Sequence, residues 1–387
     1  MRLAYFYHVN YCLKGGSLYL PEYAGRFVSE LAKNVDDLTC VGFTTQEESS
    51  EFDYCLSESN IEFVDLGQSK HFVELVLFGS FFLSKFQNQL KKCDVILVRA
   101  PSPLAPFFYF KFKNFCKVSY LFVGDYAVGV KHQSNPYIKQ RLINLFTWIY
   151  ERVQNRALRG SVVLANSPQL IKKYQSICKF LSEVKTTTLL NTDIEYRSSS
   201  CESEIIKLLF VGRIERAKGV FDLLEVFNRI NNSGSLVELH LVGWDTIEKE
   251  DFSKNCQRSD FKNQIVFHGY KSGSELSRIF SDADIFVLPS YHEGFPRTIW
   301  EAMAKGLPVI VSNVGAVSSN LRNFEDAIIF EPGDLVSLEN AILQCIGNRE
   351  LRMSMIGNGY RLAEELTLEK QTPMLFESLN RLIQLNT

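Results

Sequence analysis

Residues 283–312 read ADIFVLPSYHEGFPRTIWEAMAKGLPVIVS, and this stretch decides the fold of the second half of the chain. Its two ends, Ala283–Leu288 and Pro308–Ser312, are short apolar runs of the kind that form buried strands. Between them lie a glycine, a proline and a helical pattern. A strand, a helix and a second strand in this order are typical of a parallel sheet covered by helices. The stretch therefore predicts a β/α/β unit.

The same alternation of apolar runs and helical patterns extends in both directions from this unit. One of the helical patterns places Ala24, Phe27, Val28 and Leu31 on a single face. The whole chain is therefore expected to have an α/β fold with parallel sheets. The other expected strands are Leu3–Val9, Leu38–Phe43, Asp94–Val98, Ser119–Val123, Ser161–Ala165, Ile206–Val211, Leu236–Val242, Gln264–His268 and Ala327–Phe330.

A polar segment interrupts this alternation near the middle of the chain. It contains Arg197-Ser198-Ser199-Ser200 and has no apolar periodicity, as is typical of a linker. The length of 387 residues also suits two domains. We therefore expect an N-terminal domain at 1–192, a linker at 193–204 and a C-terminal domain at 205–365. A final helix at 366–387 is expected to pack back onto the N-terminal domain.

Composition and charge exclude several classes of protein. The formal net charge of -2 gives no basic field that would attract nucleic acid. The nine cysteines are odd in number and form no CxxC pair, so reduced thiols are expected in place of a disulfide framework or a zinc site. No uncharged apolar run reaches the roughly 18 residues that a membrane helix needs. We expect a cytoplasmic protein that is soluble or bound to the inner face of the cytoplasmic membrane.

A loop with glycines and cations follows the expected strand Ile206–Val211. Arg213 and Lys218 put two positive charges at the mouth of the sheet, where open α/β sheets bind ligands. Arginine and lysine are suitable partners for a diphosphate, and the helix expected from Val220 adds its positive end. A solvated basic loop is the alternative interpretation.

Two carboxylates follow the expected strand Ala283–Leu288. Glu293 lies in the loop and Glu301 lies one to two turns inside the helix that starts near Pro296. Carboxylates here can accept hydrogen bonds from the hydroxyls of a ribose or a hexose. Taken singly, each glutamate is equally compatible with a loop cap or a helix surface position.

Together these motifs resemble glycosyltransferase family four. The resemblance rests on Glu293-Gly294-Phe295-Pro296, on Glu301-Ala302-Met303-Ala304, on Gly306-Leu307-Pro308-Val309 and on the loop from Gly212 to Gly219. It covers the second half of the chain, whereas the first half matches in outline. The resemblance implies the GT-B fold, with two facing Rossmann-like domains and a deep cleft between them. It also implies a retaining reaction without a metal or another cofactor.

The resemblance implies a role for each residue of the motif. Arg213 and Lys218 would hold the donor diphosphate. Glu301 would bind the nucleotide ribose, and Glu293 would contact the transferred sugar near the reacting centre. The other matching positions are Gly294, Phe295, Pro296 and Arg297 around the sugar and phosphates, with Tyr270 and Lys271 beside the base.

The N-terminal domain offers candidates for the acceptor side. Gly16, in Lys14-Gly15-Gly16-Ser17, would approach the donor diphosphate, or it belongs to a turn without a ligand. Asp125 follows an expected strand and would serve as a catalytic base or as an anchor for a hydroxyl, or it caps a turn. Lys131 and His132 are weaker candidates. The apolar stretches Phe72–Phe86 and Pro106–Lys113 suit either buried helices or a membrane interface.

These features predict an enzyme, a glycosyltransferase. It would move a hexose or N-acetylhexosamine from a nucleotide-diphosphate sugar to a hydroxyl of a glycan or lipid-linked acceptor, in bacterial surface polysaccharide synthesis. One alternative is a GT-B nucleotide-sugar epimerase that needs no acceptor. Another is a non-catalytic protein that binds nucleotide sugars. An NAD enzyme is disfavoured because no GxGxxG follows the first expected strand.

Overall fold

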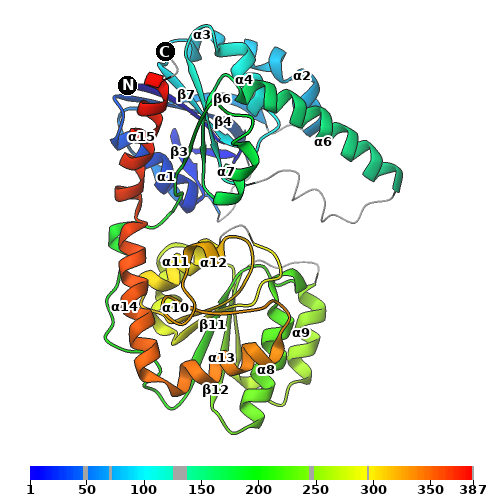
Figure 1. Ribbon diagram of the computed structural model, residues 1–387, viewed down its shortest axis with the longest axis vertical. Helices are drawn as coiled ribbons and strands as arrows, with labels where there is room; N and C mark the ends of the chain where they lie inside the picture. Colours follow the sequence, from blue (N-terminus) through cyan, green and yellow to red (C-terminus); the bar gives the residue numbers. More distant parts are fainter. Residues whose placement is uncertain (47–50, 69–71, 125–136, 244–247, 294–295, 386–387) are drawn as a thin grey trace. The chain divides into compact units, whose positions relative to one another are not determined.

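The structure of the chain is a computed structural model that describes residues 1–46, 51–68, 72–124, 137–243, 248–293 and 296–385. Two separate groups of elements form compact units (Figure 1). Unit 1 comprises Met1–Thr188 together with Leu368–Thr387, and unit 2 is the continuous segment Leu189–Thr367. The chain therefore passes from one unit to the other twice.

Unit 1 is built on a sheet whose central strands run parallel. The strand order is β10-β9-β8-β7-β1-β4-β2-β3-β5, and β6 pairs with the other side of β4. Most central strands are continuous apolar runs, as expected for a parallel sheet that is buried on both faces. Strand bounds are β1 (Arg2–Phe6), β2 (Tyr11–Lys14), β3 (Ser17–Leu20), β4 (Asp37–Thr45), β5 (Tyr54–Leu56), β6 (Ile61–Gln68), β7 (Val95–Ala100), β8 (Lys117–Phe122), β9 (Val162–Ala165) and β10 (Phe180–Glu183).

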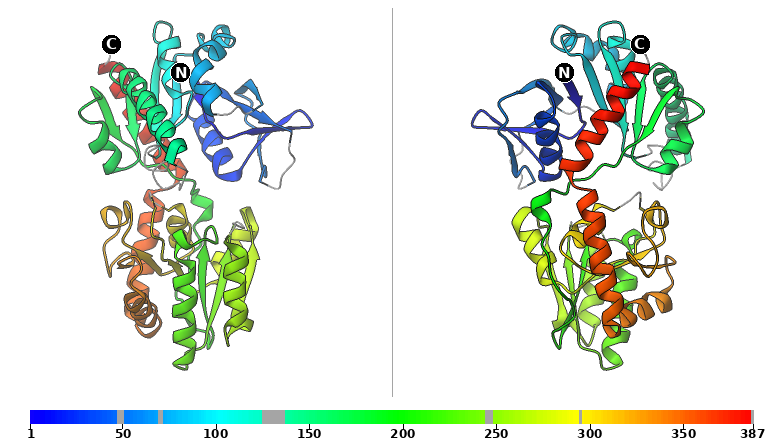
Figure 2. Two further views of the ribbon diagram at one scale, coloured as in Figure 1. Left: turned by 90° about the vertical axis from the view of Figure 1, so that its right-hand side faces the viewer. Right: turned by 60° about the vertical axis from the view of Figure 1, so that its left-hand side comes forward.

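Helices cover both faces of this sheet. The apolar face predicted for α1, with Phe27, Val28 and Leu31, is buried. The C-terminal helix α15 packs against α1, β9 and β10, and Figure 2 shows it running along the sheet of unit 1. The helices are α1 (Glu22–Lys33), α2 (Phe72–Ser84), α3 (Gln87–Leu90), α4 (Ala105–Phe112), α6 (Tyr137–Leu158), α7 (Pro168–Tyr174) and α15 (Leu368–Leu385).

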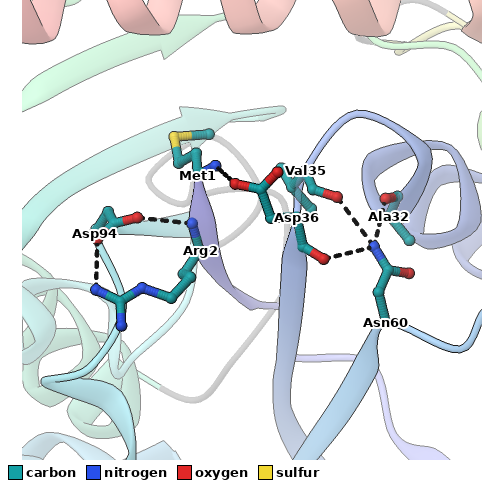
Figure 3. Close-up of polar contacts among 7 residues, drawn as sticks. All are labelled: Met1, Arg2, Ala32, Val35, Asp36, Asn60 and Asp94. Atoms are coloured by element: carbon teal, nitrogen blue, oxygen red, sulfur yellow. Dashed lines mark hydrogen bonds and ion pairs between the residues drawn. The ribbon is translucent and has the colours of Figure 1, made fainter.

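Polar contacts tie together the strands of unit 1 at the amino ends of β1 and β7 (Figure 3). The amino group of Met1 pairs with Asp36, and the Asp94 carboxylate accepts hydrogen bonds from the backbone and side chain of Arg2, each at 2.8 Å. The Asn60 amide donates to the carbonyls of Ala32 and Val35 at 2.8 and 3.0 Å. Ligands of open α/β sheets bind at the opposite, carboxyl edge, so these contacts stabilise the edge of the unit 1 sheet where no ligand is expected.

Unit 2 contains six parallel strands in the order β13-β12-β11-β14-β15-β16. The strands are β11 (Ile206–Val211), β12 (Val237–Val242), β13 (Ile265–Gly269), β14 (Ile285–Leu288), β15 (Val309–Ser312) and β16 (Ile328–Phe330). The helices are α8 (Val220–Asn232), α9 (Lys249–Arg258), α10 (Gly273–Asp282), α11 (Arg297–Ala304), α12 (Val317–Asn320), α13 (Leu335–Gly347) and α14 (Arg349–Glu365). Three short 3-10 turns lie at Asn191–Asp193, Arg216–Lys218 and Lys262–Gln264.

The segment 193–204, expected as a linker, is bound to unit 2 along its length. The guanidinium of Arg197 donates to the carbonyls of Ser281 and Ala283 at 2.6 and 2.7 Å. Asp284 accepts a hydrogen bond from the backbone of Cys201 at 2.9 Å. Arg197 thus satisfies carbonyls that the end of α10 leaves free. The structure thus assigns residues 193–204 to unit 2, through long-range partners that leave no periodic signal in the sequence.

Candidate functional site

Unit 2 has a topological switch point between β11 and β14. From β11 the chain moves outward through β12 and β13, and then returns to the other side of β11 for β14 and its successors. Loops that follow two such strands diverge and leave a crevice at the carboxyl edge, where open α/β sheets bind ligands. The two loops predicted to carry the donor site, after β11 and after β14, are the loops at this switch point.

The two loops are in backbone contact. The N–H of Tyr291 donates to the carbonyl of Ala217 at 2.9 Å. Gly219 has a φ of +67°, and a Cβ there would lie 1.9 Å from the carbonyl oxygen of Pro289. Only glycine fits this position, because it combines a left-handed backbone with a close approach. The first residues of α8 are thereby held against the loop that carries Glu293.

Lys218 and Glu293 meet at the switch point. The Lys218 Nζ lies 2.5 Å from Glu293 Oε1, and the two side chains are only 16% and 12% exposed. Ser290 Oγ donates to the same carboxylate oxygen at 2.9 Å. The charges of this largely buried lysine and glutamate neutralise each other. A ligand that binds to either side chain must therefore compete with the ion pair. The structure therefore brings together one predicted phosphate-binding cation and the predicted sugar-binding carboxylate.

Ser290 is itself held in place by the next strand. Its carbonyl accepts a hydrogen bond from Ser312 Oγ at the end of β15, at 2.5 Å, and both serines are fully buried. The loop after β14 is thus anchored to β15 at Ser290, three residues before Glu293. Such support from neighbouring groups restricts the positions that the Glu293 carboxylate can take.

A second polar contact fixes the loop after β14 to α8. Tyr291 donates its hydroxyl proton to Asp222 Oδ2 at 2.6 Å. This hydrogen bond to a carboxylate, together with burial, raises the pKa of Tyr291 to about 12. The hydroxyl therefore stays protonated and acts as a donor at neutral pH.

The other cations of the loop after β11 lie farther out. Arg213, which is more than half exposed, pairs with Glu215 at 2.9 Å. Arg216 pairs with Asp251 at 2.7 Å and lies over the ring of Phe221. In the described part of the chain, Arg213 makes no ion pair or hydrogen bond with Lys218 or Glu293. Arg213 and Lys218, both predicted to hold the diphosphate, therefore have different partners in the structure.

Helix α11 carries the remaining motif residues. Arg297 is its first residue and is exposed, whereas Glu301, one turn further on, is half-buried. Pro296 occupies the position just before the helix, not inside its first turn as its sequence pattern suggested. Gly294 and Phe295 lie outside the residues that the structure describes.

The two residues predicted beside the base follow β13, the edge strand of the sheet. Lys271 pairs with Glu275 in α10 at 3.2 Å, and Tyr270 precedes it directly. Two strand spacings separate β13 from β11, roughly 10 Å. Nearby, the rings of His240 and His268 stack, and their nitrogens lie 3.0 Å apart.

Of the site residues predicted in unit 1, the structure describes Gly16 only. Gly15 and Gly16 form the two-residue turn of the β2–β3 hairpin, with φ angles of +56° and +84°. This turn type requires positive φ at both positions, so the hairpin accounts for both glycines without a ligand. The diphosphate role of Gly16 stays a prediction. Asp125, Lys131 and His132 lie outside the described residues.

The supporting residues Ser290, Ser312, Asp222 and Tyr291 were missed at the level of sequence. Ser312 ends an apolar strand and Ser290 lies two residues after one, which is the only signal that marked them. Within the described parts of the chain, no cluster of three or more His, Cys, Asp or Glu is arranged to hold a metal ion. No described helix combines the length and apolarity needed to cross a bilayer.

Unit 2 resembles a known family of enzymes. Residues 194–362 match the model for glycosyl transferases group 1. This match covers less than half of the chain and almost all of unit 2. It contains both loops of the switch point and therefore Lys218, Glu293 and Glu301.

Relatives whose names state an activity are also transferases. The capsular polysaccharide biosynthesis glycosyltransferase CapM of Staphylococcus aureus is 27% identical over 175 residues, which is 45% of each chain. The chain thus spans less than half the length of this relative. The O-antigen chain mannosyltransferase B of Escherichia coli is 26% identical over 165 residues, covering 42% of this chain and 43% of the relative. The protein CapJ of Staphylococcus aureus is 22% identical over 96% of this chain and 91% of its own length. These similarities indicate a transferase enzyme.

Solved structures resemble the chain over nearly its whole length. The sucrose-phosphate synthase of Thermosynechococcus elongatus has a TM-score of 0.71 at 19% identity, covering 98% of this chain and 99% of its own. HepE of Anabaena, in complex with UDP, has a TM-score of 0.72 at 16% identity, covering 98% and 100%. These likenesses show the fold: the chain has two Rossmann-like domains of the GT-B class, as the sequence predicted.

Proposed function

We propose that the protein is a retaining glycosyltransferase of family four that uses a nucleotide-diphosphate sugar as donor. It would transfer a hexose or N-acetylhexosamine to a hydroxyl of a glycan or lipid-linked acceptor in bacterial surface polysaccharide synthesis. The observation that carries the proposal is the Lys218–Glu293 pair at the switch point of unit 2. The names of CapM and of the O-antigen mannosyltransferase support the pathway, and the UDP complex of HepE supports the donor class.

In this proposal the two charges of the pair separate when the donor binds. Lys218 turns to the diphosphate, and Glu293 is released to hydrogen-bond the hydroxyls of the sugar. Negative charge grows on the diphosphate as the glycosidic bond breaks, and the ammonium of Lys218 stabilises it. Arg213 would leave Glu215 and add a second contact to the phosphates. With two cations and the amino end of α8 available, we propose that no metal is needed.

The other roles follow the family motif and remain proposals. Glu301 would accept hydrogen bonds from the ribose, and Tyr270 and Lys271 would border the base. Arg297 and its predecessors 294–296 would face the sugar and phosphates. On the acceptor side, Asp125 would be a base or a hydroxyl anchor.

The first experiment measures binding and slow hydrolysis of UDP-, GDP- and ADP-sugars by the full chain. Lys218→Met should weaken binding of a nucleoside diphosphate more than binding of the nucleoside. Glu293→Gln should retain nucleotide binding and lower turnover by about 100-fold, the scale of one transition-state contact. A matched control is Lys254→Met on α9, which removes an exposed lysine that pairs with Glu250.

The outcomes also separate the alternatives. An epimerase would convert the donor without any acceptor and release no nucleoside diphosphate. A binding protein would bind a donor with no turnover, whichever acceptor is offered. If none of the nucleotides binds to the folded wild type, the proposed function is wrong. Comparison of the anomeric configuration of donor and product by NMR tests retention separately.

Contact with a membrane is a further part of the proposal. Helices α2, α4 and α6 pack in a row on unit 1 (Figure 1). On α2 the side chains of Phe78 and Phe81 are 62% and 71% exposed, and Trp148 on α6 is about half exposed. Lys85 lies over the ring of Phe81, and Arg152 lies 4.0 Å from the ring of Trp148. Exposed aromatic rings beside cations suit the surface of an anionic bilayer.

Vesicle sedimentation tests this contact. Wild type should bind vesicles that contain phosphatidylglycerol more strongly than vesicles of phosphatidylcholine alone. The double variant Phe78→Ser/Phe81→Ser should bind at least about 10-fold less, because each ring would lose apolar burial. Met374→Ser on α15 is the control, since it also removes an exposed apolar side chain. Equal binding by the double variant and wild type would exclude this surface.

A further inference from the structure

Unit 1 has its own topological switch point, between β1 and β7. The chain moves from β1 to β4 and β6 on one side, and β7 with its successors lies on the other side. Phe6 and Val98 are partners in the parallel register, so Tyr7, just after β1, and Arg99, the penultimate residue of β7, stand at the same level near the ends of the two strands. Ligands of open α/β sheets bind beyond such strand ends. A charged residue here is therefore placed at a potential binding edge.

Arg99 is half-buried against aromatic rings and has few polar partners. Its guanidinium carbon lies 4.6 Å from the ring centre of Tyr7 and 5.2 Å from that of Phe27. Its one hydrogen bond among the described residues runs from Nη1 to the hydroxyl of Tyr5, at 3.3 Å. The Nε atom is buried and has no hydrogen-bond partner. No carboxylate of the described residues forms an ion pair with it.

An arrangement of this kind is costly unless something compensates the charge. Withdrawing a guanidinium from water without a counter-charge destabilises the fold, and a buried polar atom without a partner requires an explanation, of which a functional role is one. Cation–π contacts with two rings offset part of this cost, yet they leave the buried Nε–H donor unused. An oxyanion would supply both the opposite charge and the acceptors.

The charge of Arg99 makes the surroundings of the β1 end positive. Burial lowers the pKa of Arg99 and the neighbouring tyrosines, Tyr5 first, raise it; the net effect is a raised pKa, so the guanidinium stays charged. Burial and the charge of Arg99 lower the pKa of His8, which follows β1 directly. His8 therefore takes up a proton less readily while Arg99 is uncompensated. An anion bound to Arg99 would relieve this repulsion.

We propose that Arg99 binds a carboxylate or phosphate group at the carboxyl edge of the unit 1 sheet. Resting on the proposed function, this group belongs to the acceptor, so the acceptor is an acidic sugar or a phosphorylated one. Arginine presents a planar fork that matches both oxyanions, whereas a neutral sugar would leave the charge uncompensated. Tyr7 and Phe27 support the guanidinium through their ring contacts.

The competing explanation is that Arg99 only clamps β1 and α1 together. Hydrogen exchange measured by mass spectrometry on the full chain distinguishes the two, because it reports each region separately. The probes are inorganic phosphate and glucuronate, with glucose as a neutral control. Peptides that cover 1–10 and 95–104 report the site at Arg99, and a peptide that covers 212–220 reports the donor loop.

We expect at least one of the two anions to slow exchange in the peptides of unit 1, while glucose does not. Protection by phosphate identifies a phosphorylated acceptor, and protection by glucuronate identifies an acidic sugar. Arg99→Met should raise the anion concentration for half protection at least 10-fold, and Arg99→Lys should restore part of the effect. Arg159→Met is the matched control, because Arg159 is an exposed arginine of the same unit.

Two results would overturn this proposal. One is the absence of protection at 1–10 and 95–104 with both anions, and the other is protection that persists in Arg99→Met. Protection at 212–220 alone would overturn it while leaving the proposed donor site intact. Conversely, if no nucleotide binds, the proposed function is wrong, but anion binding at Arg99 can still be measured.

Discussion

At the scale of single residues, the site in unit 2 depends on one glycine, Gly219. Gly219 lets the loops after β11 and β14 touch, and any Cβ would collide with the carbonyl of Pro289. Gly219→Ala should lower the free energy of unfolding of unit 2 by at least about 1–3 kcal/mol, since it adds a clash to an unfavourable φ. Denaturant titration measures this loss. Nucleotide binding should weaken in parallel, because Lys218 precedes Gly219 directly.

Gly357→Ala is the matched control for this substitution. Gly357 lies inside α14, and a Cβ there meets nothing within 4 Å. Alanine should therefore stabilise the helix by about 0.5–1 kcal/mol. If Gly219→Ala proved as harmless as Gly357→Ala, the two loops would not be in the contact described.

A second prediction for a single residue concerns acid sensitivity. Burial and the neighbouring His240 and Lys271 lower the pKa of His268 below its ordinary value of 6.5. As the pH falls through that value, the unfolded chain takes up a proton that the folded unit resists, so stability decreases. His268→Gln should reduce this decrease between about pH 7 and 5. Denaturant titrations across that range measure the difference.

The exposed His292 offers a control, because His292→Gln removes a histidine from the same unit. That variant should keep the acid sensitivity of wild type. An unchanged pH dependence in His268→Gln would show that another group causes the loss of stability.

At the scale of elements, α15 is part of the core of unit 1 although it is the last helix of the chain. Its residues Leu375, Leu379 and Leu382 are buried, and it contacts α1, β9 and β10. Leu379→Ala should cost about 2–5 kcal/mol, the usual range for a fully buried leucine. Hydrogen exchange should accelerate in α1 and β9. Leu385→Ala, at a position 64% exposed, should change neither quantity.

At the scale of the whole molecule, the two units differ in how the chain completes them. Unit 2 is continuous, whereas unit 1 needs both Met1–Thr188 and Leu368–Thr387. A fragment of residues 189–367 should therefore fold alone, with a cooperative denaturant transition. A fragment of residues 1–188 should be less stable and should gain stability when a peptide of residues 368–385 is added. No stabilisation by the peptide would contradict the assignment of α15 to unit 1.

Much of unit 2 was predictable because its elements have strong local signals. The predicted strands there agree with the observed ones to within two residues at each end, since parallel strands buried on both faces are continuous apolar runs. In unit 1 the strands β2, β3, β5, β6 and β10 were missed. They are short or half-exposed, and their mixture of polar and apolar residues resembles that of loops.

The sequence by itself determined the alternation of strands and helices, and it placed Lys218 and Glu293 in loops that follow strands. These features depend on residue type and spacing along the chain. Only the tertiary structure decided that Glu293 pairs with Lys218, while Arg213 pairs with Glu215. It also decided that Arg197 binds 193–204 to unit 2 and that Arg99 stands beside Tyr7. The physical reason is that these contacts depend on strand order and register, which join residues far apart in the chain.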